Sequence, residues 1–255
     1  MTTIQSVTAP PLCAARPATA CAAPESREPE DSWSESATRG RDALDFGTIR
    51  NARTAAMLPM MDAGVQLALN AATAAVMGGA ASALVSVEGY LAHHHVRVDY
   101  NVSAAGLAGE GTIGGIPMRD GIALLGEGGN GVMTSQVGKA KLEAHGHMHG
   151  ERLHVDGTLG GVTMHMTIGE SAEEGDLRLS GYLNGSEFHE DLAFGPSEDA
   201  GAIEMVATGH VGRRKLERSY VIRHGEDGAL AIDGQGRLGR GNPTDLHIEM
   251  HVQRA

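Results

Sequence analysis

Aromatic residues are scarce in this chain, since they make up only 3% of its 255 residues. A core with so few rings has to be built from Leu, Ile, Val, Met and Ala. Cysteine is equally rare, and the two present, Cys13 and Cys21, lie in an N-terminal stretch rich in Ala, Pro and Thr. The folded part is therefore expected to contain neither a disulfide nor a thiolate metal ligand.

The chain also lacks Lys and Arg clusters of the kind that nucleic-acid binders use, and its formal net charge is −12. These properties argue against a surface that binds phosphates, so no nucleic-acid partner is expected. Residues 1–53 contain neither the basic start nor the continuous apolar run of a secretory signal. We expect a disordered leader at 1–53, a single domain at 54–255, and a cytoplasmic location in preference to export.

The sequence motifs of the common enzyme classes are missing as well. We find no GxSxG, HExxH, GxxxxGK[ST] or CxxC pattern, and no Rossmann glycine pattern after a predicted strand. The sequence therefore gives no reason to assign catalysis, and a non-enzymatic role is favoured.

Glycine, in contrast, is abundant, with 36 residues, and it recurs within a fixed pattern. Each copy has a small or apolar residue, a second small or polar one, Gly, any residue, and an apolar residue directly before a tight-turn sequence. Seven segments follow this rule: VEGYL (87–91), GEGTI (109–113), AHGHM (144–148), VDGTL (155–159), LSGYL (179–183), ATGHV (207–211) and GQGRL (234–238). Such turns between alternating runs predict a series of β-hairpins.

Continuing this alternation predicts about fourteen strands between residues 83 and 253, arranged as an antiparallel up-and-down meander. A sheet this wide is expected to close into a barrel or to fold into a flattened sandwich. An Ala-rich helix from Asp62 to Met77 should pack on the apolar face. The patterned glycines share that face, where either the sheet bends sharply or the helix packs against bare backbone.

Alternation alone does not say which face of the barrel is outside. A water-soluble barrel has its apolar face inside, whereas an outer-membrane barrel turns that face toward lipid. The scarcity of aromatic residues, the missing export signal and the apolar helix favour the water-soluble form. The membrane form stays open as an alternative.

Histidine is unusually frequent, with thirteen residues. The polar face of three neighbouring strands carries a candidate metal site made of His145, His147, His154, Asp156 and His165. If His149 and Gly150 form the turn, His145 lies opposite His154, and Asp156 lies opposite His165 in the next hairpin. Imidazole and carboxylate groups at cross-strand spacing suit zinc or copper. The alternative is a set of solvated surface residues.

Charged residues with inward parity form a second candidate site. Glu190 and Arg218 are expected to pair inside the barrel across Ala207, either to fix the strand register or to line a ligand pocket. Tyr100 and Tyr220 share this parity and are candidates for contacts with the same ligand. Polar groups that are simply satisfied within the core are the alternative interpretation.

A hairpin near residue 184 predicts a third arrangement, on the polar face. Ser180 should face His189, and Arg178 should face Asp191. An open strand face offers no oxyanion hole and no water-excluding cleft, so we expect a surface ion pair there and not a catalytic triad.

For function, these observations favour a non-enzymatic carrier of an apolar small molecule or lipid, if helix and barrel leave a cavity. Without a cavity, an interaction scaffold is expected. An outer-membrane-type barrel and a metal-dependent enzyme using the histidine cluster are the alternatives. Neither the ligand nor the oligomeric state follows from the sequence.

Overall fold

The structure is a computed structural model, and it describes residues 58–91, 94–124, 130–150, 152–159, 162–170, 177–183, 186–239 and 243–253. The leader expected at residues 1–53 lies outside this part of the chain.

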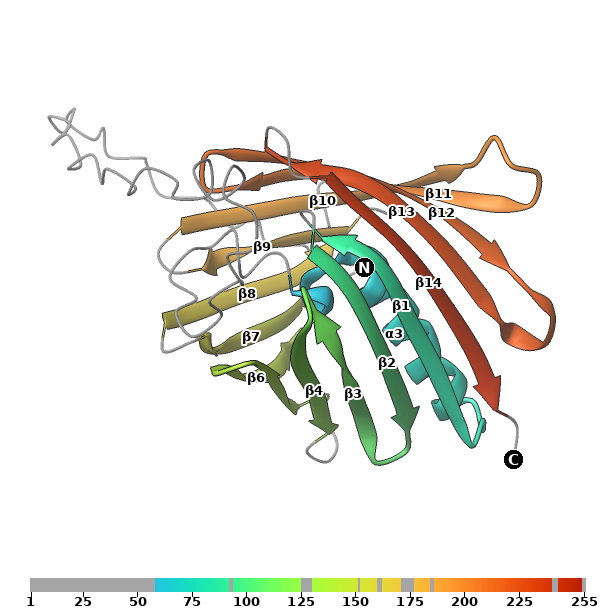
Figure 1. The fold of residues 1–255 in the computed structure, drawn as a ribbon, viewed down its shortest axis with the longest axis horizontal. Coiled ribbons are helices and arrows are strands. Elements are labelled where there is room, and N and C mark those ends of the chain that lie inside the picture. The colour runs from blue at the N-terminus through green and yellow to red at the C-terminus, as the bar shows by residue number, and fades with distance from the viewer. Residues whose placement is uncertain are drawn as a thin grey trace, which may run out of the picture. The chain divides into compact units, whose positions relative to one another are not determined.

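Fourteen antiparallel strands form a closed barrel, in which each strand pairs with the next and β14 pairs with β1 (Figure 1). The sequence left a barrel and a flattened sandwich open, and the barrel is the observed form. The elements in chain order are η2 (Pro59–Met61), α3 (Ala63–Met77), β1 (Ser82–Leu91), β2 (His94–Ser103), β3 (Gly106–Ile113), β4 (Ile116–Leu124), β5 (Gly131–Val137), β6 (Ala140–His149), β7 (Arg152–Leu159), β8 (Val162–Glu170), β9 (Leu177–Leu183), β10 (Ser186–Pro196), β11 (Ala202–Val211), β12 (Arg214–His224), η3 (Glu226–Gly228), β13 (Leu230–Leu238) and β14 (Pro243–Gln253).

The two ends of the barrel carry different turns and chain segments. In an up-and-down meander, alternate turns lie at the same end. We call the end with the α3–β1 connection and the last residues of β14 the C-terminal end. The turns that follow β2, β6, β10 and β12 also lie there. The turns that follow the odd-numbered strands lie at the opposite end.

The apolar face of the sheet lies inside the barrel. In β14, buried and exposed residues alternate from Thr244 to His251. Leu246, Ile248 and Met250 are buried, whereas the residues between them, His247 and Glu249, are exposed. The same alternation in β2 and β12 makes one continuous apolar interior.

Six of the seven patterned glycines lie at the opposite end, each two residues before the end of an odd-numbered strand. A Cβ atom added to any of these six would overlap with a carbonyl oxygen of the adjacent strand, as at Gly181 against His165 and at Gly209 against His189. Close approach of the adjacent strand therefore explains these glycines, and packing of the helix against them does not. Gly146, near the C-terminal end, has no such neighbour. In β5 the equivalent position is Ser135.

One hairpin differs in register from the expectation. His149 pairs with Arg152, so the β6–β7 turn lies between these two residues and not at His149 and Gly150. Gly150 has φ = +62°, a conformation that favours glycine within the turn. The shift is two residues, so every side chain keeps its face, but His145 lies opposite Asp156 and not opposite His154.

Helix α3 begins and ends where the sequence predicted. Asp62 caps its first turn by accepting hydrogen bonds from the backbone N–H groups of Gly64 and Val65. The helix runs inside the barrel along β1, β2, β13 and β14 (Figure 1). Its buried face contains mostly small residues, which bring helix and sheet close together. Among the described residues, no helix is long and apolar enough to cross a membrane.

Candidate functional site

A buried polar cluster anchors the first turn of α3 to the barrel wall. One carboxylate oxygen of Asp62 caps the helix, and the other accepts a hydrogen bond from the hydroxyl of Tyr220 at 3.0 Å. Nη1 of Arg218 lies 3.1 Å from the same oxygen, Oδ2. The cluster therefore ties the start of the helix to β12.

The ring of Tyr220 fills a gap that two glycines leave open. A Cβ atom on Gly64 of α3 would lie 2.6 Å from this ring, and one on Gly234 of β13 would lie 2.7 Å from it. The ring thus packs between helix and sheet because both neighbours lack a side chain.

Glu190 and Arg218 both point into the barrel, as their parity predicted, and are 5% and 4% exposed. Arg218 Nη1 lies 3.9 Å from Glu190 Oε1, which is too long for a hydrogen bond. The register places Arg218 beside Ala207 and Glu190 beside Gly209, so small residues separate the pair. The closer partner of Arg218 is Asp62, which the sequence indicated only as a helix cap.

Two carboxyl groups thus share one guanidinium in an apolar interior. Burial raises the pKa of Glu190 to about 7; the charge of Arg218 lowers it, and that of Asp62 raises it further. Burial alone would lower the pKa of Arg218, but Tyr220 and Asp62 raise it above its ordinary value. Arg218 therefore stays charged, and Glu190 exchanges its proton near neutral pH.

A second buried pair joins β2 to β4. The hydroxyl of Tyr100 donates a hydrogen bond to Asp120 at 2.9 Å, and the tyrosine ring covers Gly109 on the strand between them. Burial raises the pKa of Asp120 to about 6, although the hydrogen bond from Tyr100 and the nearby Ser135 hydroxyl oppose the rise. The four residues predicted to contact a ligand (Tyr100, Glu190, Arg218 and Tyr220) are therefore all buried, and they serve two internal networks. Their role in ligand binding stays a prediction.

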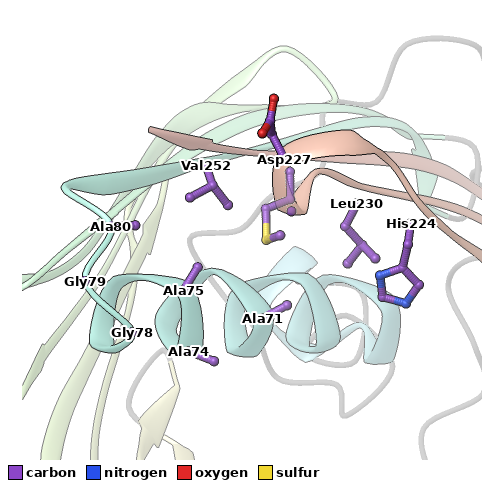
Figure 2. Close-up of a pocket in the computed structure, with 12 residues that line it drawn as sticks. Ala71, Ala74, Ala75, Gly78, Gly79, Ala80, His224, Asp227, Leu230 and Val252 are labelled. Carbon is purple, nitrogen blue, oxygen red and sulfur yellow. The ribbon is translucent and has the colours of Figure 1, made fainter. Parts of the chain in front are cut away.

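An open pocket of about 680 Å³, which we call the cavity, lies elsewhere, between the C-terminal half of α3 and strands β13 and β14 (Figure 2). The helix side consists of small residues, Ala71, Ala74, Ala75 and Gly78, and the strand side of Leu230, Met250 and Val252. His224 and Asp227 stand at its edge. In Figure 2 the imidazole of His224 lies level with the helix, whereas the carboxylate of Asp227 points away from it. None of the four predicted ligand residues lines this cavity.

The cavity lies at the C-terminal end of the barrel, where apolar side chains are unusually exposed. Met148, Leu177, Phe194 and Ile203 have inward parity, yet their exposed fractions are 38–45%. Met77, at the end of α3, is 82% exposed. The interior is therefore accessible from this end, whereas the equivalent residues deeper in the barrel are buried.

The candidate metal residues lie on the outer face of β6, β7 and β8. The register pairs His147 with His154 and Asp156 with His165. His145 turns toward Glu143, with Nε2 3.9 Å from Oε1. As the side chains stand, no three His, Cys, Asp or Glu groups converge on one ion position anywhere in the described ranges. The metal site stays a prediction.

The third arrangement forms the expected surface contacts. Ser180 pairs with His189 in the register, and Arg178 donates from Nε to Asp191 at 2.6 Å. Nε2 of His189 lies 2.6 Å from the other oxygen of Asp191. The imidazole is therefore directed along its own strand toward Asp191. The contact between Arg178 and Asp191 confirms the predicted surface ion pair.

Sequence reasoning did not identify the cavity or the second role of Asp62. The cavity depends on which face of an almost uniformly small helix packs against the sheet, and alternation in the strands does not determine this. No protein-family model, curated protein or solved structure matches this chain.

Proposed function

We propose that this barrel binds an apolar small molecule in the cavity between α3 and strands β13 and β14. The observation that carries the proposal is a cavity of about 680 Å³ with apolar residues on both walls. This volume falls in the range of about 300–1,000 Å³ that is typical of small-molecule sites. The sequence favoured a carrier on the condition that helix and barrel leave such a space.

The small residues on α3 explain why there is space for a ligand. Near its start, the helix carries Val65 and Leu69, which are buried against the barrel. Near its end, Ala71, Ala74 and Ala75 present only methyl groups to the opposite strands. A ligand there would contact a smooth apolar wall on one side and Leu230 and Met250 on the other.

The C-terminal end of the barrel, where the cavity lies, also exposes inward-facing apolar side chains. An apolar ligand that approaches this end would meet Phe194, Ile203 and Leu177 before it reaches the interior. Exposed apolar surface around an apolar cavity is a common feature of binding sites.

The alternatives receive less support from the geometry. A lipid-facing barrel needs an apolar band on its outer surface. Here Asp245, His247 and Glu249 occupy successive outward positions in the middle of β14. A catalytic role would need polar groups converging inside the cavity, and the described lining offers only His224 and Asp227 at its edge.

A tryptophan placed in the cavity tests the proposal. Ala75→Trp fills the space between helix and strands, and Asn70→Trp puts the same side chain on an exposed position of α3 that does not line the cavity. We expect the wild-type protein and N70W to bind the neutral dye Nile red with similar affinity and A75W to lose most of this binding. Circular dichroism melting checks that both variants fold.

Equal dye binding by A75W and the wild type would refute the cavity as the binding site. Native mass spectrometry of the protein as purified supplies an independent measurement. An additional mass present on the wild type and N70W, but absent from A75W, would identify the natural ligand of the cavity.

A further inference from the structure

Four imidazoles lie close together on the outer face of β6–β8, and three of them contact the fourth, His154. The ring of His147, directly opposite on β6, is stacked on it at a centroid distance of 5.5 Å. The rings of His149 and His165 have their centroids 6.2 and 6.4 Å away. Side chains from three different strands therefore meet at His154.

Two of these rings have one nitrogen fixed by a neighbour. Nδ1 of His165 contacts the carboxylate of Asp156, and a carboxylate can only accept, so the ring donates Nδ1–H. Nδ1 of His154 lies 3.2 Å from the hydroxyl oxygen of Thr167, which can accept in the same way. The neutral His165 ring then keeps Nε2 free of hydrogen, as a metal ligand requires, and the neutral His154 ring does the same when Thr167 accepts from its Nδ1–H.

This pairing is the usual environment of histidines that bind metal. Such a histidine donates its second N–H group to a carboxylate or to another oxygen, which fixes the tautomer and orients the ring. The carboxylate at His165 and the hydroxyl at His154 occupy these supporting positions. The rings do not converge as they stand. His147, His165 and Asp156 are exposed, so His147 can turn toward His154, and His165 can do so together with its partner Asp156, without disturbing the core.

We propose that His147, His154 and His165 bind one divalent transition-metal ion, such as Zn²⁺, Cu²⁺ or Ni²⁺, on the outer face of the barrel. Imidazole nitrogen is a preferred ligand of all three ions. Asp156 and Thr167 are positioning residues for His165 and His154. His145 is not part of the ligand set because it turns toward Glu143.

The chain contains a matched pair of histidines for comparison. His189 and His210 also face each other on neighbouring strands, with ring centroids 5.3 Å apart. There, however, Nε2 of His189 contacts Asp191, and no third imidazole contact is found near this pair among the described residues. This second pair should therefore not form a site of comparable affinity.

The test is isothermal titration of the untagged full-length chain with Zn²⁺, repeated with Cu²⁺. We expect one ion per chain in the wild type, loss of this site in His154→Ala, and unchanged binding in His210→Ala. Asp156→Asn should weaken binding by roughly tenfold, because changes in supporting residues typically reduce metal affinity 10- to 100-fold. Circular dichroism of each variant checks folding, and none of the three positions is buried in the core.

Three results would each overturn the proposal: no stoichiometric binding by the wild type, wild-type affinity in H154A, or equal loss of binding in H210A and H154A. These outcomes are independent of dye binding in the cavity, because His154 lies on the outer face and does not line the cavity.

Discussion

Replacing Glu190 by glutamine removes the carboxyl group of the buried cluster that lies farther from the guanidinium of Arg218. Arg218 lies closer to Asp62 than to Glu190, at 3.1 Å against 3.9 Å. Burial raises the pKa of Glu190 in the folded protein to about 7, from an ordinary value of 4.5. The folded state therefore holds a proton that the unfolded state has already lost between these two pH values.

The sign of the effect follows from this difference in bound protons. Glu190 destabilises the fold as pH rises from 4.5 through 7, and its contribution becomes constant above that. One proton corresponds to about 1.4 kcal/mol for each pH unit. Between pH 6 and pH 8 this titration lowers the free energy of unfolding by roughly 1 kcal/mol. E190Q cannot ionise, so its free energy of unfolding should rise by that amount relative to that of the wild type between pH 6 and pH 8.

Urea denaturation at pH 6, 7 and 8, followed by far-UV circular dichroism, measures this difference. Far-UV circular dichroism reports directly on the strands of the barrel. Glu187→Gln is the matched control, since Glu187 is an exposed residue of the same strand. Comparison with the wild type at each pH cancels the contributions that other titrating groups make to the free energy of unfolding. Parallel pH dependence of E190Q and the wild type would refute a proton held by Glu190.

Three further changes test other parts of the structure. Gly181→Ala adds a Cβ that overlaps with the carbonyl oxygen of His165, so urea denaturation should show a loss of about 2 kcal/mol or more in the free energy of unfolding. Gly195→Ala is the control, because nothing lies within 4 Å of its added Cβ, and it should change this free energy by less than about 0.5 kcal/mol. Equal effects would contradict the close approach of the adjacent strand at Gly181. Tyr220→Phe removes the hydrogen bond to Asp62 and should cost about 1.5–3 kcal/mol by the same measurement, and a neutral result would exclude the anchor. In a fluorescence titration, Nile red should bind more tightly than an anionic dye of similar size, because the described cavity lining contains an aspartate and no Lys or Arg. Tighter binding of the anionic dye would contradict an apolar cavity with no cationic group.

The strand order and the inward face could be predicted because the pattern has a period of two and each turn is short. A two-residue error in the register of a hairpin leaves every side chain on its own face. The inward positions of Glu190 and Arg218 therefore did not depend on which two residues form each turn. Cross-strand partners do depend on them. The slip at Gly150 therefore gave the wrong partner for His145 but left the rest of the histidine cluster on one face.

The position of the helix relative to the strands could not be predicted in this way. Alanine and glycine give α3 no strongly apolar stripe, so its sequence does not say which side meets β13 and β14. The contact of Asp62 with Tyr220 joins residues 158 positions apart and arises only once the helix lies inside the closed barrel. The cavity has the same origin, because it is the space between two elements whose separate patterns do not determine their distance.

The anchor and the cavity lie at opposite ends of the same helix, and this arrangement explains how a barrel with few aromatic residues keeps an accessible interior. At the start of α3, a helix cap, a guanidinium and a tyrosine ring fix the helix to the wall. At its end, alanine side chains make few contacts with the strands, and those contacts contribute little burial energy. A ligand can therefore occupy the far half of the helix face without loss of the interactions that hold the near half. The same logic predicts that substitutions in the anchor lower stability, whereas those in the cavity change binding.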